Sequence, residues 1–485
     1  MAEALKLKVV DEFQVSPPQD SVPTTTLPLS FFDIPFLFIS QGKRIFFYEF
    51  PHPTHHFMEA VLPHLKQSLS LTLKHFFPVA ANIVFPPQPN KPHVLFDSGS
   101  SSVSFTVAES TADFNYLITD SPRAVSSVDP FVPKIPPARV LDDGTRLFPL
   151  LAIQATVIPN SGFSICIRFH HGIGDGMAFQ HFVRSWAFQC KKLISTKPEE
   201  EEEGGKHSSL PIFNNGSTIP DPNGVELCFL NFLWKWTPAL LKMADGSGSE
   251  FNSTHNSVNV DATFKVTQTH IDKLKQLISL KFYNGNESES EPVEKAPLRL
   301  STFVVSCALI WVCLAKSEEN TYIDDEEPYN FTFVADCRGR FEFSSVPATY
   351  FGNCVAPVYA TLKRKEIVGE NGIVEAAKAI RNKIKELEKN GVLKVAERWM
   401  LDAIEKTTTK HNVMVAGSPK LGVYEMDFGW GSPKKSDVLG NPGSILISLS
   451  ESKDKNLGGI EVGVGLEKTQ MNNFIQTFDQ TLKIL

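Results

Sequence analysis

The sequence predicts an α/β fold with more than one domain, and three observations support this prediction. The stretch SICIRFHHGIGDG, residues 164–176, begins with the alternating apolar pattern of a strand and ends in a glycine-rich turn. Residues 177–189 follow with helical spacing, so strand, turn and helix come in succession. A second strand and helix are expected at 262–267 and 270–280. A chain of 485 residues with 42% hydrophobic content is long enough for two or three domains with full cores.

The first part of the chain is expected to supply strands and one amphipathic helix. Apolar side chains recur near helical spacing over residues 55–76, which predicts a helix facing the core. A proline-punctuated apolar connection, LPLSFFDIPFLF, occupies residues 27–38. The strands predicted here are residues 6–15, 43–50, 93–107 and 148–158. Histidines gather near the helix, but no cysteine or carboxylate completes a metal-binding set, so no metal site is expected.

His170 and His171 end the strand of the 164–176 stretch. The glycines after them, Gly174 among them, disfavour a helix, so the histidines are expected where the strand leaves the sheet. A neutral imidazole is a suitable general base for a hydroxyl group, and Asp175 lies four residues beyond His171 in the pattern HxxxD. Neighbouring residues of a strand face opposite ways, so we expect His171 to act and His170 to be structural. The chain has 13 histidines, so this spacing alone could arise by chance.

The domain boundary is predicted between the two halves. Residues 196–258 contain five consecutive glutamates at 199–203, a DPNG turn and a loose polar stretch, which together indicate a crossover. The prediction is therefore an N-terminal domain at 1–195, a crossover at 196–258 and a C-terminal domain at 259–485. The apolar residues 225–243 are expected to pack within the crossover, and residues 301–317 to form a buried helix in the C-terminal domain.

Composition excludes several classes of protein. A net charge of −7 argues against a nucleic-acid-binding surface. Seven scattered cysteines without a CxxC pair indicate free thiols in a reducing compartment. The first residues lack an apolar signal-peptide core and no segment reaches transmembrane length, so we expect a cytoplasmic protein without a membrane span.

Motifs of the commoner enzyme classes are absent from the sequence. It has no GxSxG, GxxxxGK or HExxH pattern and no GxGxxG after a strand, which disfavours serine hydrolases, P-loop NTPases, zinc proteases and dinucleotide enzymes. A histidine base without a partner nucleophile or metal would act directly on a hydroxyl of the substrate.

A second motif, YEMDFGWG, occupies residues 424–431. Two glycines around an aromatic residue could be no more than a bend. Together with HxxxD at 171–175, however, DFGWG at 427–431 resembles the signature pair of the plant BAHD acyl-CoA-dependent acyltransferases. The resemblance covers nearly the whole chain and includes LPLSFFD at 27–33, SLSLTLKHFFPVAAN at 68–82 and ADCRGR at 335–340. YFGNC at 350–354 is similar to the branch of anthocyanin and flavonoid glycoside malonyltransferases and hydroxycinnamoyltransferases.

The resemblance implies two similar-sized α/β domains, like those of chloramphenicol acetyltransferase, with a central solvent channel. It implies an O-acyltransferase that moves an acyl group from acyl-CoA to a sugar hydroxyl of a phenolic glycoside, without a further cofactor and as a monomer. Malonyl is favoured as the acyl group, and a hydroxycinnamoyl group is the alternative. A non-catalytic homologue that binds a phenolic ligand also stays open.

The resemblance also assigns residues to the site. His171 is the expected base, and Asp427 is grouped with it among the catalytic residues, although its role is expected to be architectural. Asp175 is expected to pair with Arg338 and to shape the loop that aims His171. Trp430 either donates its indole N–H to an oxyanion or packs. The further residues expected to support the site are Gly174 and Gly429, and those expected to contact CoA are Lys275, Ser301 and Thr302.

Overall fold

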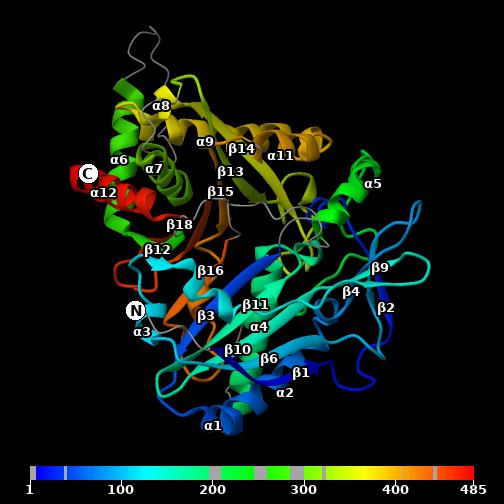
Figure 1. Ribbon diagram of the computed structural model, residues 1–485. Coiled ribbons are helices and arrows are strands. Elements are labelled where there is room, and N and C mark those ends of the chain that lie inside the picture. The colour runs from blue at the N-terminus through cyan, green and yellow to red at the C-terminus, as the bar shows by residue number, and fades with distance from the viewer. Residues whose placement is uncertain are drawn as a thin grey trace.

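The chain folds into two sheet-rich halves, each covered by helices, with a smaller third sheet beside the first half (Figure 1). The computed structural model describes residues 7–37, 41–195, 209–244, 259–284, 300–318, 324–407, 409–440 and 445–485. Both halves share one large hydrophobic core. The acidic run at 199–203 and the insertion at 285–295 lie outside the described residues.

The first sheet has six strands and belongs mainly to the N-terminal half. Its order is β1-β6-β10-β11-β3-β16, with bounds β1 Leu7–Val15, β6 Val103–Ser110, β10 Leu151–Ile158, β11 Gly162–Phe169, β3 Gly42–Glu49 and β16 Lys435–Val438. Two helices, α2 (Leu62–Leu73) and α4 (Gly176–Ile194), pack together on one face, and the indole of Trp186 donates to Leu65 O. The buried stripe of α4 follows the helical period, which explains why it packs along the sheet.

The second sheet has seven strands and belongs mainly to the C-terminal half. Its order is β14-β13-β15-β17-β18-β12-β7, with bounds β14 Val355–Lys363, β13 Pro328–Asp336, β15 Asn412–Gly417, β17 Ile445–Glu451, β18 Ile460–Glu467, β12 Asn259–Val266 and β7 Arg123–Ala124. Its helices, together on one side in Figure 1, are α6 Gln268–Asn284, α7 Thr302–Ser317, α9 Gly372–Asn390 and α12 Lys468–Ile484. Of these, α7 is buried over almost its whole length because nearly every residue is apolar.

The third sheet and the shorter elements complete the fold. The sheet has the order β2-β5-β4-β9-β8, with bounds β2 Thr25–Pro28, β5 His93–Phe96, β4 Asn82–Phe85, β9 Arg146–Pro149 and β8 Arg139–Val140. The other α-helices are α1 Thr54–His56, α3 Phe114–Leu117, α5 Val225–Ala244, α8 Arg364–Val368, α10 Leu393–Ala396 and α11 Trp399–Thr407. Single turns include a π-helical turn at Phe57–Val61 and 3₁₀ turns at Ile34–Phe36 and His171–Ile173.

Most predicted elements are present, and three differ. The strand predicted over 93–107 is two strands, β5 and β6, which belong to different sheets and are separated by a turn. The helix predicted over 55–76 is interrupted by the π-helical turn and ends at Leu73. The connection at 27–38 contains the end of β2 and a 3₁₀ turn. The predicted alternation of strand and helix across the glycine turn at 172–176 is confirmed by β11 and α4.

The two halves exchange one strand each. β7 comes from the N-terminal half but pairs with β12 in the seven-stranded sheet, and β16 comes from the C-terminal half but pairs with β3 in the six-stranded sheet. An ion pair between Arg123 of β7 and Asp437 of β16 joins the exchanged strands. The boundaries 1–195, 196–258 and 259–485 therefore remain a prediction about chain segments, while the sheets cross them.

No helix in the described part of the chain combines the length and the apolar character needed to cross a membrane. The seven cysteines are all free, as the sequence predicts.

Candidate active site

The site is built where β11 ends and α4 begins. His171 opens a 3₁₀ turn directly after the strand, and Asp175 is the N-cap residue of α4. Gly174 must be small, because a Cβ there would lie 2.8 Å from the Cβ of Ala178. The glycine turn therefore brings the base and the carboxylate of HxxxD close to the same helix end.

His171 has one accessible ring nitrogen. The ring lies against the aromatic rings of Phe169 and Phe36, at centroid distances of 4.8 and 5.6 Å. Nδ1 is buried without a hydrogen-bond partner among the described residues, which leaves Nε2 as the nitrogen open to a substrate. Burial lowers the pKa of His171 below its ordinary value of 6.5, against the opposing effects of the Gly174 backbone and Asp175. A neutral imidazole at physiological pH suits a general base.

His170 is structural, as the alternation along the strand predicts. Its side chain is buried, and its Nδ1 accepts a hydrogen bond of 3.0 Å from the backbone N–H of Gly172. Burial, and to a smaller extent the neighbouring His171, lower the pKa of His170 to about 4. His170 is therefore neutral and buried, and its hydrogen bond to Gly172 stabilises the turn that carries His171.

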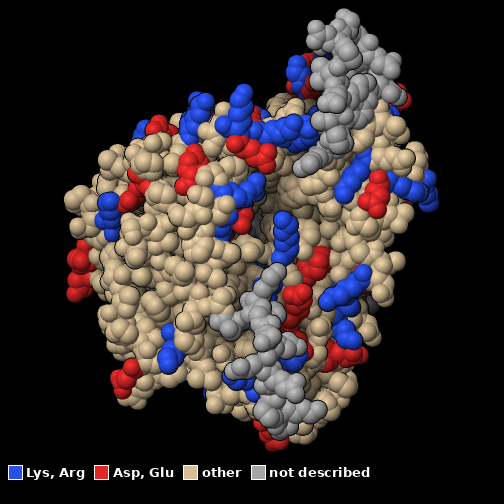
Figure 2. All heavy atoms as spheres, turned by 180° about the vertical axis from the view of Figure 1, so that it is seen from behind, with Lys and Arg blue, Asp and Glu red and all other residues tan. Residues whose placement is uncertain are grey.

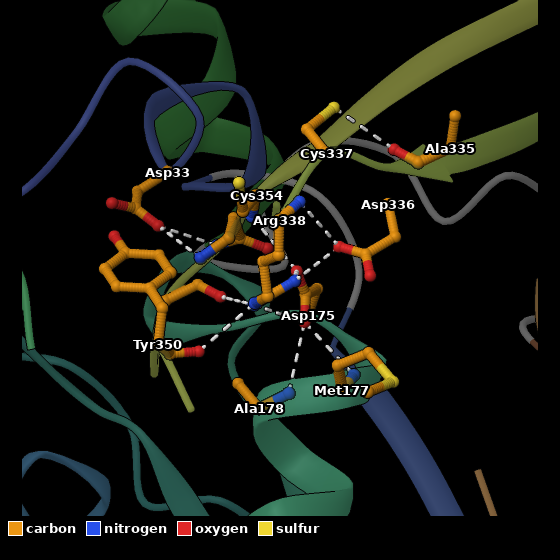
Figure 3. Close-up of polar contacts among 12 residues, drawn as sticks. Asp33, Asp175, Met177, Ala178, Ala335, Asp336, Cys337, Arg338, Tyr350 and Cys354 are labelled. Carbon is orange, nitrogen blue, oxygen red and sulfur yellow. Dashed lines mark hydrogen bonds and ion pairs between the residues drawn. The ribbon is translucent and has the colours of Figure 1, made fainter. Parts of the chain in front are cut away.

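Arg338 and Asp175 form the expected buried ion pair (Figure 3). Two guanidinium nitrogens of Arg338 donate to the two carboxylate oxygens at 2.8 and 3.0 Å, and the side chains are only 3% and 7% exposed. Asp175 also accepts hydrogen bonds from the backbone of Met177, Ala178 and Cys354. Burial opposes the charge on Arg338, but Asp175 and Asp336 outweigh burial and raise the pKa of Arg338. Asp175 has no oxygen left for a proton relay, so it holds the loop in place.

A second network, which the sequence analysis missed, holds the backbone of His171. The side chain of Asn353 donates to His171 O at 2.8 Å and to Asp33 Oδ1 at 2.8 Å. Asp33 is buried and also accepts two hydrogen bonds from Ser30, while burial raises its pKa. The available signal was a single acidic residue inside the apolar stretch at 27–38, where an unpaired carboxylate would be costly.

Replacing Asn353 by alanine is expected to lower kcat about 10- to 100-fold, because a small displacement of the base is enough for such a loss. KM for acyl-CoA should stay close to the wild-type value. Steady-state kinetics check this, with Asp33→Asn as the matched variant that keeps an acceptor oxygen for Asn353. Equal losses in both variants would show that the two residues support only the fold.

The DFGWG segment lies far from His171, so Asp427 has the architectural role expected of it and its grouping with the catalytic residues is corrected. Asp427 accepts hydrogen bonds from the backbone of Gly429 and Gly431 and pairs with Lys191 at 3.0 Å. Lys191 is near the C-terminal end of α4, about 22 Å along the helix from its first residue. Burial favours protonation of Asp427, but the Gly429 N–H and Lys191 lower its pKa. Asp427 is thus not a catalytic residue: it stabilises a turn at the far end of α4.

Trp430 and Gly429 belong to the same turn. The ring of Trp430 lies 6.4 Å from that of Phe163, at the opposite end of β11 from Phe169 and about 20 Å away along the strand. Its indole N–H cannot reach an oxyanion at His171, so the packing alternative holds. Gly429 has φ +110°, and a Cβ there would lie 2.6 Å from Ile194. Only glycine fits this turn against the end of α4.

The three residues expected to contact CoA lie on the helices behind the seven-stranded sheet. Lys275 is half-buried on α6, and Ser301 caps α7 by accepting from Val304 N at 3.2 Å. Thr302 is the first residue of α7. Phe303 packs on Phe333 and Trp311 on Phe331, so the start of α7 faces the end of β13 that leads to Arg338. Among the described residues, no hydrogen bond joins Lys275 to the other two, and their contact with CoA remains a prediction.

Comparison with known proteins finds similar proteins along nearly the whole chain. The family model described as the Transferase family matches residues 5–481. The chain is 35% identical to coumaroyl-CoA:anthocyanidin 3-O-glucoside-6''-O-coumaroyltransferase 1 of Arabidopsis thaliana, over 98% of this chain and 97% of that protein. It is 33% identical to malonyl-coenzyme A:anthocyanin 3-O-glucoside-6''-O-malonyltransferase of Dahlia pinnata, over 98% of each. The crystal structure of vinorine synthase has the same fold, with a TM-score of 0.63 at 17% identity over 96% of both chains.

Proposed function

Because the chain belongs to the Transferase (BAHD) family and is an acyl-CoA-dependent acyltransferase, we propose that it acylates a sugar hydroxyl of a phenolic glycoside with His171 as the base. The observation that carries the proposal is His171 itself, a half-buried imidazole with lowered pKa and one open nitrogen, fixed by two separate networks. Relatives named as anthocyanin and phenolic glucoside acyltransferases support the choice of acceptor.

The reaction we propose is direct transfer with both substrates bound. Nε2 of His171 takes the proton of the sugar hydroxyl while that oxygen forms a bond to the thioester carbonyl carbon. The carbon–sulfur bond then breaks, and the imidazolium returns the proton to the departing thiolate of CoA. Holding both substrates in one cleft contributes through proximity, and the base contributes about 10²–10⁴-fold. No cofactor beyond acyl-CoA takes part in this scheme, and we propose a cytoplasmic monomer.

Malonyl is the acyl group that we propose first, in line with the malonyltransferases among the relatives. A hydroxycinnamoyl group is the second candidate, and one observation favours it. The partly exposed ring of Phe36 lies beside His171 and would pack against an aromatic acyl group.

A donor panel against one flavonoid glucoside tests this proposal. Malonyl-CoA, acetyl-CoA and p-coumaroyl-CoA are each supplied to the wild-type protein, and the product is identified by mass. A malonylated product supports the first donor and a coumaroylated product the second. Folded protein that gives no product with any donor would favour the non-catalytic binding protein.

A further inference from the structure

One face of the seven-stranded sheet is turned away from its helices and towards the six-stranded sheet. Phe331 and Phe333 of β13 pack on α7, so the alternate residues, among them Val334, lie on the opposite face. The strand register continues this face across the sheet. The residues aligned on it are Met414 opposite Leu446, Ser448 opposite Gly463, Gly463 opposite Thr263, and Gly465 opposite Asp261.

The end of this face near β13 is apolar and open. Val334 is 50% exposed and Met414 is 38% exposed, which is unusual for large apolar side chains in the middle of a sheet. Val334 lies two residues before Asp336, which binds Arg338. The apolar patch of Val334 and Met414 therefore lies beside the end of β13 that leads to Arg338 and its partner Asp175.

The other end of the same face forms the floor of a cavity of about 270 Å³. The cavity is bounded by β12, β17 and β18 on one side and by Lys43 of β3 on the other. A Cβ on Gly463 would lie 2.3 Å from Ser448 Oγ, and one on Gly465 would lie 2.6 Å from Asp261 Oδ1. The two glycines therefore leave room for the side chains of Ser448 and Asp261, which line the floor of the cavity.

Most charges around the cavity are already paired. Arg123 binds Asp437, and Lys435 donates to Asp120 and Thr263, both at 2.6 Å. Asp261 differs, since its half-buried carboxylate accepts no hydrogen bond from any residue in the described ranges, and burial raises its pKa to about 6 despite the opposing charge of Arg123. A partly desolvated carboxylate still needs donors, and here they can come from water in the cavity or from a ligand that displaces it.

The chemistry of the lining selects among possible occupants. Carboxylates and cations alternate around the cavity, so a phosphate would meet Asp261 and Asp437, and a free amine would meet Lys435 and Arg123. A neutral group with several hydroxyl donors suits Asp261, Ser448 and Thr263. A single sugar ring is such a group, and the cavity is slightly smaller than the usual site for a whole small molecule, about 300–1,000 Å³.

The cavity lies near the base, and His171 is not among the residues that line it. In the register of β3 and β11, Lys43 lies opposite Arg168. Arg168 is three residues before His171, which is about 10 Å along an extended chain. From Val334 on β13 to Asp261 on β12 is four strand spacings, about 19 Å. A ligand that places its reacting hydroxyl at His171 and a polar group in the cavity must therefore have an extended middle part that spans the distance between them.

We propose that this cavity binds a second, non-reacting sugar of the acceptor, with the aromatic aglycone lying across Val334 and Met414. The inference rests on the proposed function and specifies its acceptor: a phenolic glycoside that carries sugars at two separate positions.

Two acceptors with one aglycone test this, a flavonoid 3-O-monoglucoside and the corresponding 3,5-O-diglucoside, with the same donor. Wild-type kcat/KM should favour the diglucoside about tenfold, mostly through KM, as expected for hydrogen bonds to a charged group. Asp261→Asn and Ser448→Ala should each bring this ratio close to one. The matched control is Asp479→Asn, the same chemical change on the exposed side of α12, which should leave the ratio unchanged.

Each other outcome contradicts the proposal in a distinct way. Equal use of the two glucosides by the wild type, or an unchanged ratio in both cavity variants with normal melting curves, would show that no sugar binds there. A rise in KM for acyl-CoA in Asp261→Asn would assign the cavity to the donor. Absence of transfer to either glucoside with every donor would overturn the proposed function, and this inference with it.

Discussion

Replacing His171 by alanine is expected to reduce the rate of acyl transfer by about 10²–10⁴-fold, because the variant loses the base that takes the hydroxyl proton. The loss should appear in kcat. Binding of acyl-CoA, measured by calorimetry, and the unfolding midpoint should change little, since the His171 ring makes no hydrogen bond with side chains in the described part of the chain.

His170→Asn is the matched control for this variant. An asparagine oxygen can accept the Gly172 N–H that His170 Nδ1 accepts now, so most of the activity should remain. If His170→Asn loses the activity instead, or if His171→Ala keeps wild-type activity, the assignment of the base is wrong.

Replacing Arg338 by alanine is expected to lower the free energy of unfolding by about 3–5 kcal/mol, because it leaves the Asp175 carboxylate buried without its partner. The same change frees the loop that carries His171, so activity should fall as well. Urea denaturation followed by fluorescence measures the first effect, and steady-state kinetics on the folded fraction measure the second.

Asp175→Asn should be milder than Arg338→Ala. Asparagine can still cap α4, and Arg338 keeps Asp336 and the carbonyls of Tyr350 and Gly352. An aspartate variant that is less stable than the arginine variant would contradict this account of the pair.

The sequence was enough to predict the elements that position the base. The signals were local: apolar residues alternate along the strand before His171, glycines follow it, and helical spacing comes next. The structure has β11 and α4 at these places. The partner of Asp175 also followed from the resemblance, since ADCRGR contains Arg338.

Contacts between distant segments could not be predicted from local patterns. Asp33 and Asn353 are 320 residues apart and meet through the fold alone. The exchange of β7 and β16 between the sheets has the same origin, because a strand of two or four residues leaves almost no periodic signal.

The DFGWG motif shows why a motif does not locate a side chain. Its spacing in the sequence identifies the family, yet Asp427 lies at the end of α4 remote from His171. The residues of a motif can be needed for a turn instead of for the chemistry. Gly429 is such a residue, because a Cβ there would collide with Ile194.

The pH dependence of kcat/KM tests most directly the claim that neutral His171 takes the proton. Protonated imidazole cannot act as a base, so activity should fall as pH decreases through the pKa of His171, with a midpoint below 6.5 because burial lowers that pKa. His170, with a pKa of about 4, is already neutral over most of this range. The residual activity of His171→Ala, measured at high enzyme concentration, should lack this acid limb. A midpoint above 6.5, or the same limb in the variant, would mean that another group is the base.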